Sequence, residues 1–245
     1  SETPIVSAPG GIRSIMGQAI ALYRARFLLY LGLIAIPVVP VGIAIVILAA
    51  AAPDPETATN QVTGIDVAAE FLLVMPLAQA MVAFAASAQI AGRKVALPEV
   101  LRSVLPWFGV LVGTVVLSSL LMLVGLIAFV IPGVVMAIWF QFVGQVVILE
   151  HVTFMGALRR CRELVRGNWW RTLGYVLAIG IVDGIAGVLV STLFGGVAIP
   201  SGASARARLV LPLAADIPSS ILVLPFSTIA LTIVYLRLRK LHPAP

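Results

Sequence analysis

Long apolar runs dominate the chain and alternate with short polar segments. The runs cover residues 28–52, 71–91, 107–130, 134–149, 172–193 and 217–236. A helix needs about 20 apolar residues to cross the hydrocarbon core of a membrane, and only the fourth run is shorter than that. The pattern predicts an all-α integral membrane protein whose six transmembrane helices form a single domain over residues 11–240. A disordered tail, residues 1–10, and a short tail, residues 241–245, are expected to flank it.

One shorter segment, residues 153–166, has the apolar period of a helix with a single apolar side. Its apolar residues recur three or four positions apart and share one face. They are Phe154, Ala157, Leu158, Cys161, Leu164 and Val165. Thr153 fits the N-cap position, and Gly167 with Asn168 fits a helix end in the left-handed conformation.

Basic side chains cover the opposite face of this segment, and two tryptophans follow directly. The predicted contacts with anionic lipid head groups are those of Arg159, Arg160, Arg162 and Arg166. The predicted anchors at the membrane–water boundary are Trp169 and Trp170. The alternative is a cytosolic connecting helix that packs on the protein's own spans, and the two interpretations are compatible.

The same unit, an amphipathic helix followed by two spans, recurs along the chain. In a first copy the apolar residues lie 142 positions earlier and are Ile12, Ile15, Met16, Ala19, Leu22 and Tyr23. In a second copy they lie 57 positions earlier and are Leu97, Val100, Leu101 and Val104. The shared register predicts a three-fold internal repeat, with copies at about residues 11–91, 97–151 and 153–240.

Three of the segments that link the spans are expected to be irregular. Residues 53–66 contain acidic residues but no lysine or arginine, and they are typical of a polar loop. Ile131-Pro132-Gly133 predicts a tight turn, because proline fixes φ and glycine accepts the reversal. A Gly/Ser/Ala-rich segment that holds Arg206 and Arg208 predicts a second loop.

The composition supports a membrane protein and gives its orientation. Hydrophobic residues make up 61% of the 245 residues, charged residues make up 11%, and the mean hydropathy is +1.12. With the N-terminus inside, 14 of the 16 lysines and arginines fall in inside segments, and only Arg206 and Arg208 fall outside. This bias predicts a multi-pass protein of the bacterial inner membrane with both termini cytoplasmic. It also accounts for the net charge of +6 without a nucleic-acid partner.

The sequence contains no catalytic or metal-binding constellation. His151 and His242 are the only histidines and Cys161 is the only cysteine, so metal-ligand spacings and an intrachain disulfide are excluded. Phosphate-binding loops and nucleophile elbows are also missing. Glu150 and His151 are interpreted as interfacial caps rather than as an acid–base pair. We therefore expect neither an enzyme nor a bound cofactor.

A few polar residues fall inside the predicted spans. They are Asp183, Gln141, Gln145 and Gln79. Gly180, Gly184 and Gly187 surround Asp183 with small residues, which predicts the close approach of another helix. Because a bare charge inside a membrane is costly, Asp183 is expected to be neutral and hydrogen-bonded to one of these glutamines or to Ser118. The alternative is a proton- or ion-linked site.

Residues 131–175 contain a set of short motifs that is typical of one protein family. Its parts are Ile131-Pro132-Gly133, Glu150, Ala157-Leu158, Glu163-Leu164-Val165-Arg166-Gly167, Trp170-Arg171 and Gly174. In these parts the chain resembles the glycerophosphoryl diester phosphodiesterase membrane-domain family and its stand-alone six-span relatives in bacterial inner membranes. The resemblance implies a membrane module without the catalytic barrel of the enzymes that name the family, and it transfers no catalytic residue.

Three functions fit these observations. The first is a non-catalytic accessory or scaffold module that binds lipids, with anionic lipids expected, or partner membrane proteins. The second is a transporter or permease component for a small or amphipathic solute, since repeats and buried polar groups are common in transporters. The third, a membrane-embedded enzyme acting on lipids, has the least support because no active site is evident.

Overall fold

The computed structural model describes residues 11–128, 130–195 and 202–242, and the regular elements within them are all helices. Six of these helical segments are long and apolar enough to cross a membrane. They are Phe27–Ala51, Ala58–Ile90, Leu97–Ile127, Gly133–Glu150, Trp169–Val190 and Ala205–Leu241. The protein is therefore an all-α, multi-pass membrane protein, as predicted. The two predicted tails lie almost wholly outside the described residues.

Short amphipathic helices precede the long apolar ones. The short helices are α1 (Ile12–Ala25), α5 (Leu97–Val104) and α9 (Phe154–Val165). The first long pair is α2 (Phe27–Ala51) and the continuous run of α3 (Pro55–Ala69), the π-helix η1 (Glu70–Val74) and α4 (Met75–Ile90). The second comprises η2 (Leu105–Trp107), α6 (Phe108–Ala128), α7 (Val130–Phe140) and α8 (Val143–Glu150). The third is α10 (Trp169–Gly195) and α11 (Ala205–Leu241).

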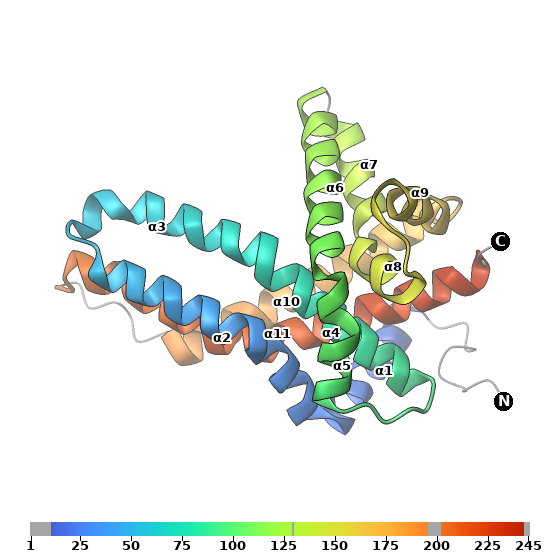
Figure 1. The fold of residues 1–245 in the computed structure, drawn as a ribbon, viewed down its shortest axis with the longest axis horizontal. Coiled ribbons are helices and arrows are strands. Elements are labelled where there is room, and N and C mark those ends of the chain that lie inside the picture. The colour runs from blue at the N-terminus through green and yellow to red at the C-terminus, as the bar shows by residue number, and fades with distance from the viewer. Residues whose placement is uncertain (1–10, 129, 196–201, 243–245) are drawn as a thin grey trace.

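The long helices form two arms that point in different directions (Figure 1). In one arm α2, α3 and the first part of α11 run side by side, and in the other α6 and α7 form a hairpin. The main core lies where the arms meet. Its largest fully buried side chains include Tyr30, Leu33, Met81, Phe142 and Tyr235. Between membrane-spanning helices, close van der Waals packing of such side chains holds the arms together, since lipid tails are as apolar as the core.

The predicted polar loop at residues 53–66 is wrong from residue 55 on, because residues 55–66 belong to helix α3. Pro55 is the first residue of α3, a position where the missing proline N–H is not needed. Val62 of this helix packs with Ile45, Ala49 and Leu209, which belong to α2 and α11. The helix is therefore stabilised by packing between segments far apart in the sequence, which a local composition does not reveal.

The predicted tight turn at Ile131-Pro132-Gly133 is wrong, because these residues are helical. Helix α6 ends at Ala128 and α7 begins at Val130, so Ile131-Pro132-Gly133 belongs to the first turn of α7. Proline is tolerated there for the same reason as at the start of α3. Gly133 serves the close approach of the two helices, since a Cβ atom at this position would lie 2.8 Å from the Cα atom of Leu126.

Two further boundaries differ from the predictions. The predicted fourth span is interrupted at Gln141 and Phe142, which separate α7 from α8. Arg206 and Arg208 lie in the first turns of α11 rather than in a loop. A guanidinium N–H of Arg206 donates to the carbonyl oxygen of Ala52 at 3.0 Å and so ties the start of α11 to the end of α2.

Hydrogen bonds join four basic segments at one end of the molecule. The Arg26 guanidinium donates to the Val95 carbonyl at 2.7 Å, which links the α1–α2 junction to the segment before α5. Arg237 near the end of α11 donates to Gln18 of α1 at 3.3 Å, and Arg160 of α9 donates to the His242 carbonyl at 2.7 Å. Helix α11 is about 55 Å long at 1.5 Å per residue, so its Arg206 end lies far from these contacts.

Candidate functional site

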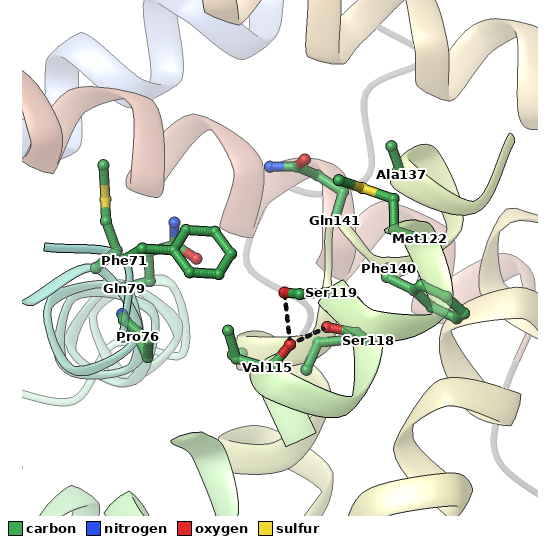
Figure 2. Close-up of a pocket in the computed structure, with 13 residues that line it drawn as sticks. Phe71, Pro76, Gln79, Val115, Ser118, Ser119, Met122, Ala137, Phe140 and Gln141 are labelled. Carbon is green, nitrogen blue, oxygen red and sulfur yellow. Dashed lines mark hydrogen bonds between the residues drawn. The ribbon is translucent and has the colours of Figure 1, made fainter. Parts of the chain in front are cut away.

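A pocket of about 290 Å³ lies beside the interruption of the fourth span (Figure 2). Helices α4, α6, α7 and α8 contribute to it, together with η1. Its polar lining residues are Gln79, Ser118, Ser119 and Gln141. Its largest apolar lining residues are Phe71, Met75, Met122 and Phe140. The side chains that line this pocket include no charged group.

The polar groups of the pocket differ in whether they have protein partners. The hydroxyls of Ser118 and Ser119 both donate to the carbonyl oxygen of Val115, at 2.8 and 2.7 Å, as the dashed lines of Figure 2 show. Over the described residues, no hydrogen bond to a protein group engages the amide of Gln79 or of Gln141. These two amides approach the same space, Gln79 from α4 and Gln141 from the turn between α7 and α8 (Figure 2).

Gln145 extends this uncharged polar region into the core. Its side chain is fully buried in α8, and both amide atoms lack a hydrogen-bond partner among the residues that the structure describes. Its neighbour Gly144 lines the pocket, and a Cβ atom at Gly144 would lie 3.8 Å from Oε1 of Gln79. The structure thus brings Gln79 and Gln141 to one pocket, with Gln145 next to a residue that lines it.

A buried ion pair lies where α8 meets α9. Nε of Arg160 is 2.8 Å from Oε2 of Glu150, and the Tyr235 hydroxyl donates to Oε1 of Glu150 at 2.7 Å. The Glu150 carboxylate also attracts Arg239, whose Nε is 3.6 Å away. His151 turns away from Glu150 into a ring contact with Trp107 at 4.7 Å between centroids. Both carboxylate oxygens are thus engaged in contacts that hold α8, α9 and α11 together.

Backbone geometry positions Glu150 for this contact. His151, directly after α8, has φ of +54°, in the left-handed region that terminates helices. Thr153 is extended at the N-cap of α9, but its hydroxyl makes no capping bond, contrary to the prediction. Gly167 ends this region with φ of +83°, which confirms the predicted left-handed helix end.

The arginines predicted to contact lipid do not share one environment. Arg159, Arg162 and Arg166 are exposed, and the Arg162 guanidinium lies 4.9 Å from the ring centre of Trp139. Arg160 is buried in the ion pair with Glu150, so it does not reach lipid head groups as predicted. The apolar face of α9 packs in the protein core, with Ala157, Cys161 and Leu164 fully buried, as the connecting-helix interpretation expects.

The two predicted anchors also differ. Trp170 is 78% exposed, whereas Trp169 packs against the core, and the rings meet edge to face with centroids 4.7 Å apart. The indole N–H of Trp169 is buried and has no hydrogen-bond partner within the described part of the chain. Trp170 is therefore the more exposed of the two predicted anchors.

Asp183 lies on α10, most of whose surface is not covered by other parts of the described chain. Ser227 of α11 is the polar side chain beside it, rather than the predicted glutamines or Ser118. Oδ1 of Asp183 is buried without a hydrogen-bond partner among the described residues. No helix of the described chain makes the predicted close approach to this face, since a Cβ atom at Gly180, Gly184 or Gly187 would meet nothing within 4 Å.

An acidic cluster that was not predicted from the sequence is formed by residues of α3, η1 and α11. Asp66, Glu70 and Asp216 line one small cavity, and their carboxylates repel one another. Asp183 is therefore not alone as an acid within the long apolar helices. The described residues contain no group of histidines, cysteines and acids arranged to hold a metal ion.

Comparison with known proteins adds a family assignment. A search of curated proteins and a search of solved structures each gave no match. The family model of a domain of unknown function, DUF7847, matches residues 94–238. These residues include α5 to α10, most of α11, the ion pair of Glu150 and Arg160, and two sides of the polar pocket. The matched region covers more than half of the sequence, and the chain therefore belongs to the DUF7847 family.

Proposed function

We propose that this protein is a non-catalytic module of a bacterial inner membrane that binds partner membrane proteins and anionic lipids. The exposure of α10 is the observation that supports this proposal best. In its most apolar stretch only 6% of the residues are buried, compared with 67% in α11. Ile181, Ile185 and Leu189 project from it beside the open glycines. A helix face with small residues and no neighbour suits packing against another membrane helix.

The three-fold repeat is the second part of the proposal. Each proposed copy begins with one of the short helices α1, α5 and α9. The equivalent residues Ile15, Val100 and Ala157 are all fully buried. The next set, Ala19, Val104 and Cys161, is fully buried as well. Equal burial at equivalent positions supports the repeat, because residues in one register then have the same role in three helices.

The proposed orientation has both termini in the cytoplasm. The four segments joined by Arg26, Arg160 and Arg237 hold most of the lysines and arginines, and they gather at one end of the molecule. Arg206 is tied to Ala52 at the other end of α11. A separation of this kind supports the orientation that positive charge favours. It also directs the exposed Arg159, Arg162 and Arg166 towards cytoplasmic head groups.

Purification from native membranes in a gentle detergent tests the module directly. We expect a stoichiometric membrane-protein partner that the variant Gly184→Leu loses, because leucine fills open space on α10 without disturbing the fold. Gly64→Leu, at an equally open position on α3, is the matched control. Replacement of Arg159, Arg162 and Arg166 by glutamine should lower the retained anionic lipid, while Arg208→Gln should not. The proposal is contradicted if Gly184→Leu keeps the partner and the triple arginine variant keeps the anionic lipid.

The polar pocket favours a second candidate, a transporter component. Interrupted helices that line a polar site in the membrane are a feature of transporters. Flux of solutes into liposomes that contain the purified protein tests this candidate. The comparisons establish no link to the glycerophosphoryl diester phosphodiesterase membrane-domain family, so that resemblance stays a prediction.

A further inference from the structure

We propose that the pocket beside Gln141 binds an uncharged amphiphile that carries a hydroxyl group, with the hydroxyl between the Gln79 and Gln141 amides. The inference does not depend on the proposed function, since a binding module and a transporter component could each use such a site. It rests on the charge of the lining, its hydrogen-bonding capacity and its shape.

The absence of charge among the lining residues selects a neutral ligand. An ionised ligand in this pocket would lose its hydration without gaining a counter-charge, which costs several kcal/mol in an apolar setting. A phosphate or carboxylate ligand is therefore excluded on energetic grounds.

The hydrogen-bonding groups select a ligand that both donates and accepts. Each glutamine amide offers two N–H donors and one carbonyl acceptor, and those of Gln79 and Gln141 are unused by the described protein groups. The hydroxyls of Ser118 and Ser119 already donate to the Val115 carbonyl oxygen, so towards a ligand they can only accept a hydrogen bond. A hydroxyl accepts from an amide N–H and donates to an amide or serine oxygen, so it satisfies groups that are costly to leave unpaired inside a membrane.

The apolar residues that line the pocket favour a ligand with an alkyl chain next to that hydroxyl. Phe71 and Met122 flank the pocket and are 47% and 37% exposed, so the pocket opens on the outer surface of η1 and α6. In a membrane this surface faces lipid tails. Met75 and Phe140 complete an apolar lining that suits a short alkyl chain. The volume of about 290 Å³ is at the lower end of the range for ligand pockets, which favours a small amphiphile over a whole phospholipid.

Photolabelling of the full chain in detergent tests the proposal. The probe is an octyl alcohol with a diazirine in its chain, and the matching carboxylic acid and alkane serve as the charged and apolar comparisons. We expect the alcohol to label peptides that contain Met75, Met122 or Phe140, and unlabelled octanol to compete. The alkane should label these peptides about five-fold less, as the loss of an ordinary hydrogen bond predicts. The acid, which is ionised at neutral pH, should label them less than the alkane does.

Three variants make the test specific. Gln79→Leu and Gln141→Leu remove the amides at nearly constant volume and should each lower labelling by the alcohol about five-fold. Gln61→Leu, on the exposed side of α3, is the matched control and should leave it unchanged. If a leucine variant fails to fold, Gly144→Ala takes its place. Its methyl group enters the pocket at an ordinary contact distance of 3.8 Å from Gln79, so it should lower labelling by the alcohol. Equal labelling by all three probes, or labelling that all the variants leave intact, overturns the proposal.

Discussion

Arg160 and Glu150 form an ion pair of 2.8 Å whose two side chains are only 9% and 6% exposed. A buried pair of this kind is costly to break, because the remaining charge is left without compensation. We predict that Glu150→Gln lowers the free energy of unfolding by about 3 to 5 kcal/mol. Thermal unfolding in detergent, followed by intrinsic fluorescence, measures the change.

The control for this prediction is the second acid near Arg160. Glu163 lies 3.6 Å from the guanidinium with a side chain that is 52% exposed, so Glu163→Gln should cost less than about 1 kcal/mol. The double variant Glu150→Gln with Arg160→Met should recover much of the lost stability, since no buried charge remains. Equal effects of the two single variants would contradict the structure.

Cys161 is predicted to be unreactive in the folded protein. Its side chain is fully buried in α9. Burial first, and the negative charge of Glu150 second, raise the pKa of the Cys161 thiol well above its usual value, against a smaller opposing effect of Arg160. At a pH of about 8 the thiolate that alkylating reagents attack is therefore almost absent. Mass spectrometry should detect maleimide addition only after denaturation, and rapid addition to the native protein would show that α9 is not packed as described.

Two glycines should respond differently to the same substitution. Gly133→Ala brings a Cβ atom to 2.8 Å from the Leu126 backbone, and we predict a loss of about 1 to 3 kcal/mol from overpacking of the α6–α7 hairpin. Gly180→Ala meets nothing within 4 Å and should change stability by less than about 1 kcal/mol. Paired melting curves measure both. A destabilised Gly180→Ala would mean that another helix covers this face.

The orientation can be measured with single cysteines. Asn60 and Ala91 are exposed at the two ends of the α3–α4 run. In a Cys161→Ala background, Asn60→Cys should react with an impermeant maleimide added to intact cells, and Ala91→Cys should react only after the membrane is opened. Labelling of position 91 from outside would reverse the proposed orientation.

Asp183→Asn separates a structural from an ionisable role of this side chain. Asparagine keeps the size and the hydrogen bonding beside Ser227 but cannot ionise. If Asp183 only holds α10 to α11, the variant should fold and keep its partners and lipid at every pH. A normally folded variant that loses a pH-dependent flux in liposomes would instead favour the transporter candidate.

Local patterns in the sequence determined the class of fold. Runs of about 20 apolar residues gave the membrane spans, and the period of residues 153–166 gave α9 with its buried face, because both depend only on neighbouring residues. The same local signals failed at residues 53–66, where polar composition suggested a loop. Packing of Val62 on Ile45 and Leu209 stabilises a helix there.

Only part of the candidate site could be predicted from the sequence. Gln79, Gln141 and Gln145 stand out as polar residues in apolar runs, but their grouping depends on how α4 packs against α6 and α8. The interruption at Gln141 and the acidic cluster of Asp66 with Asp216 likewise arise from contacts between distant segments. Arg160 is the clearest case, since the sequence places it on the polar face of α9. Only the tertiary structure brings Glu150 and the His242 carbonyl close enough to offset the cost of burying its charge.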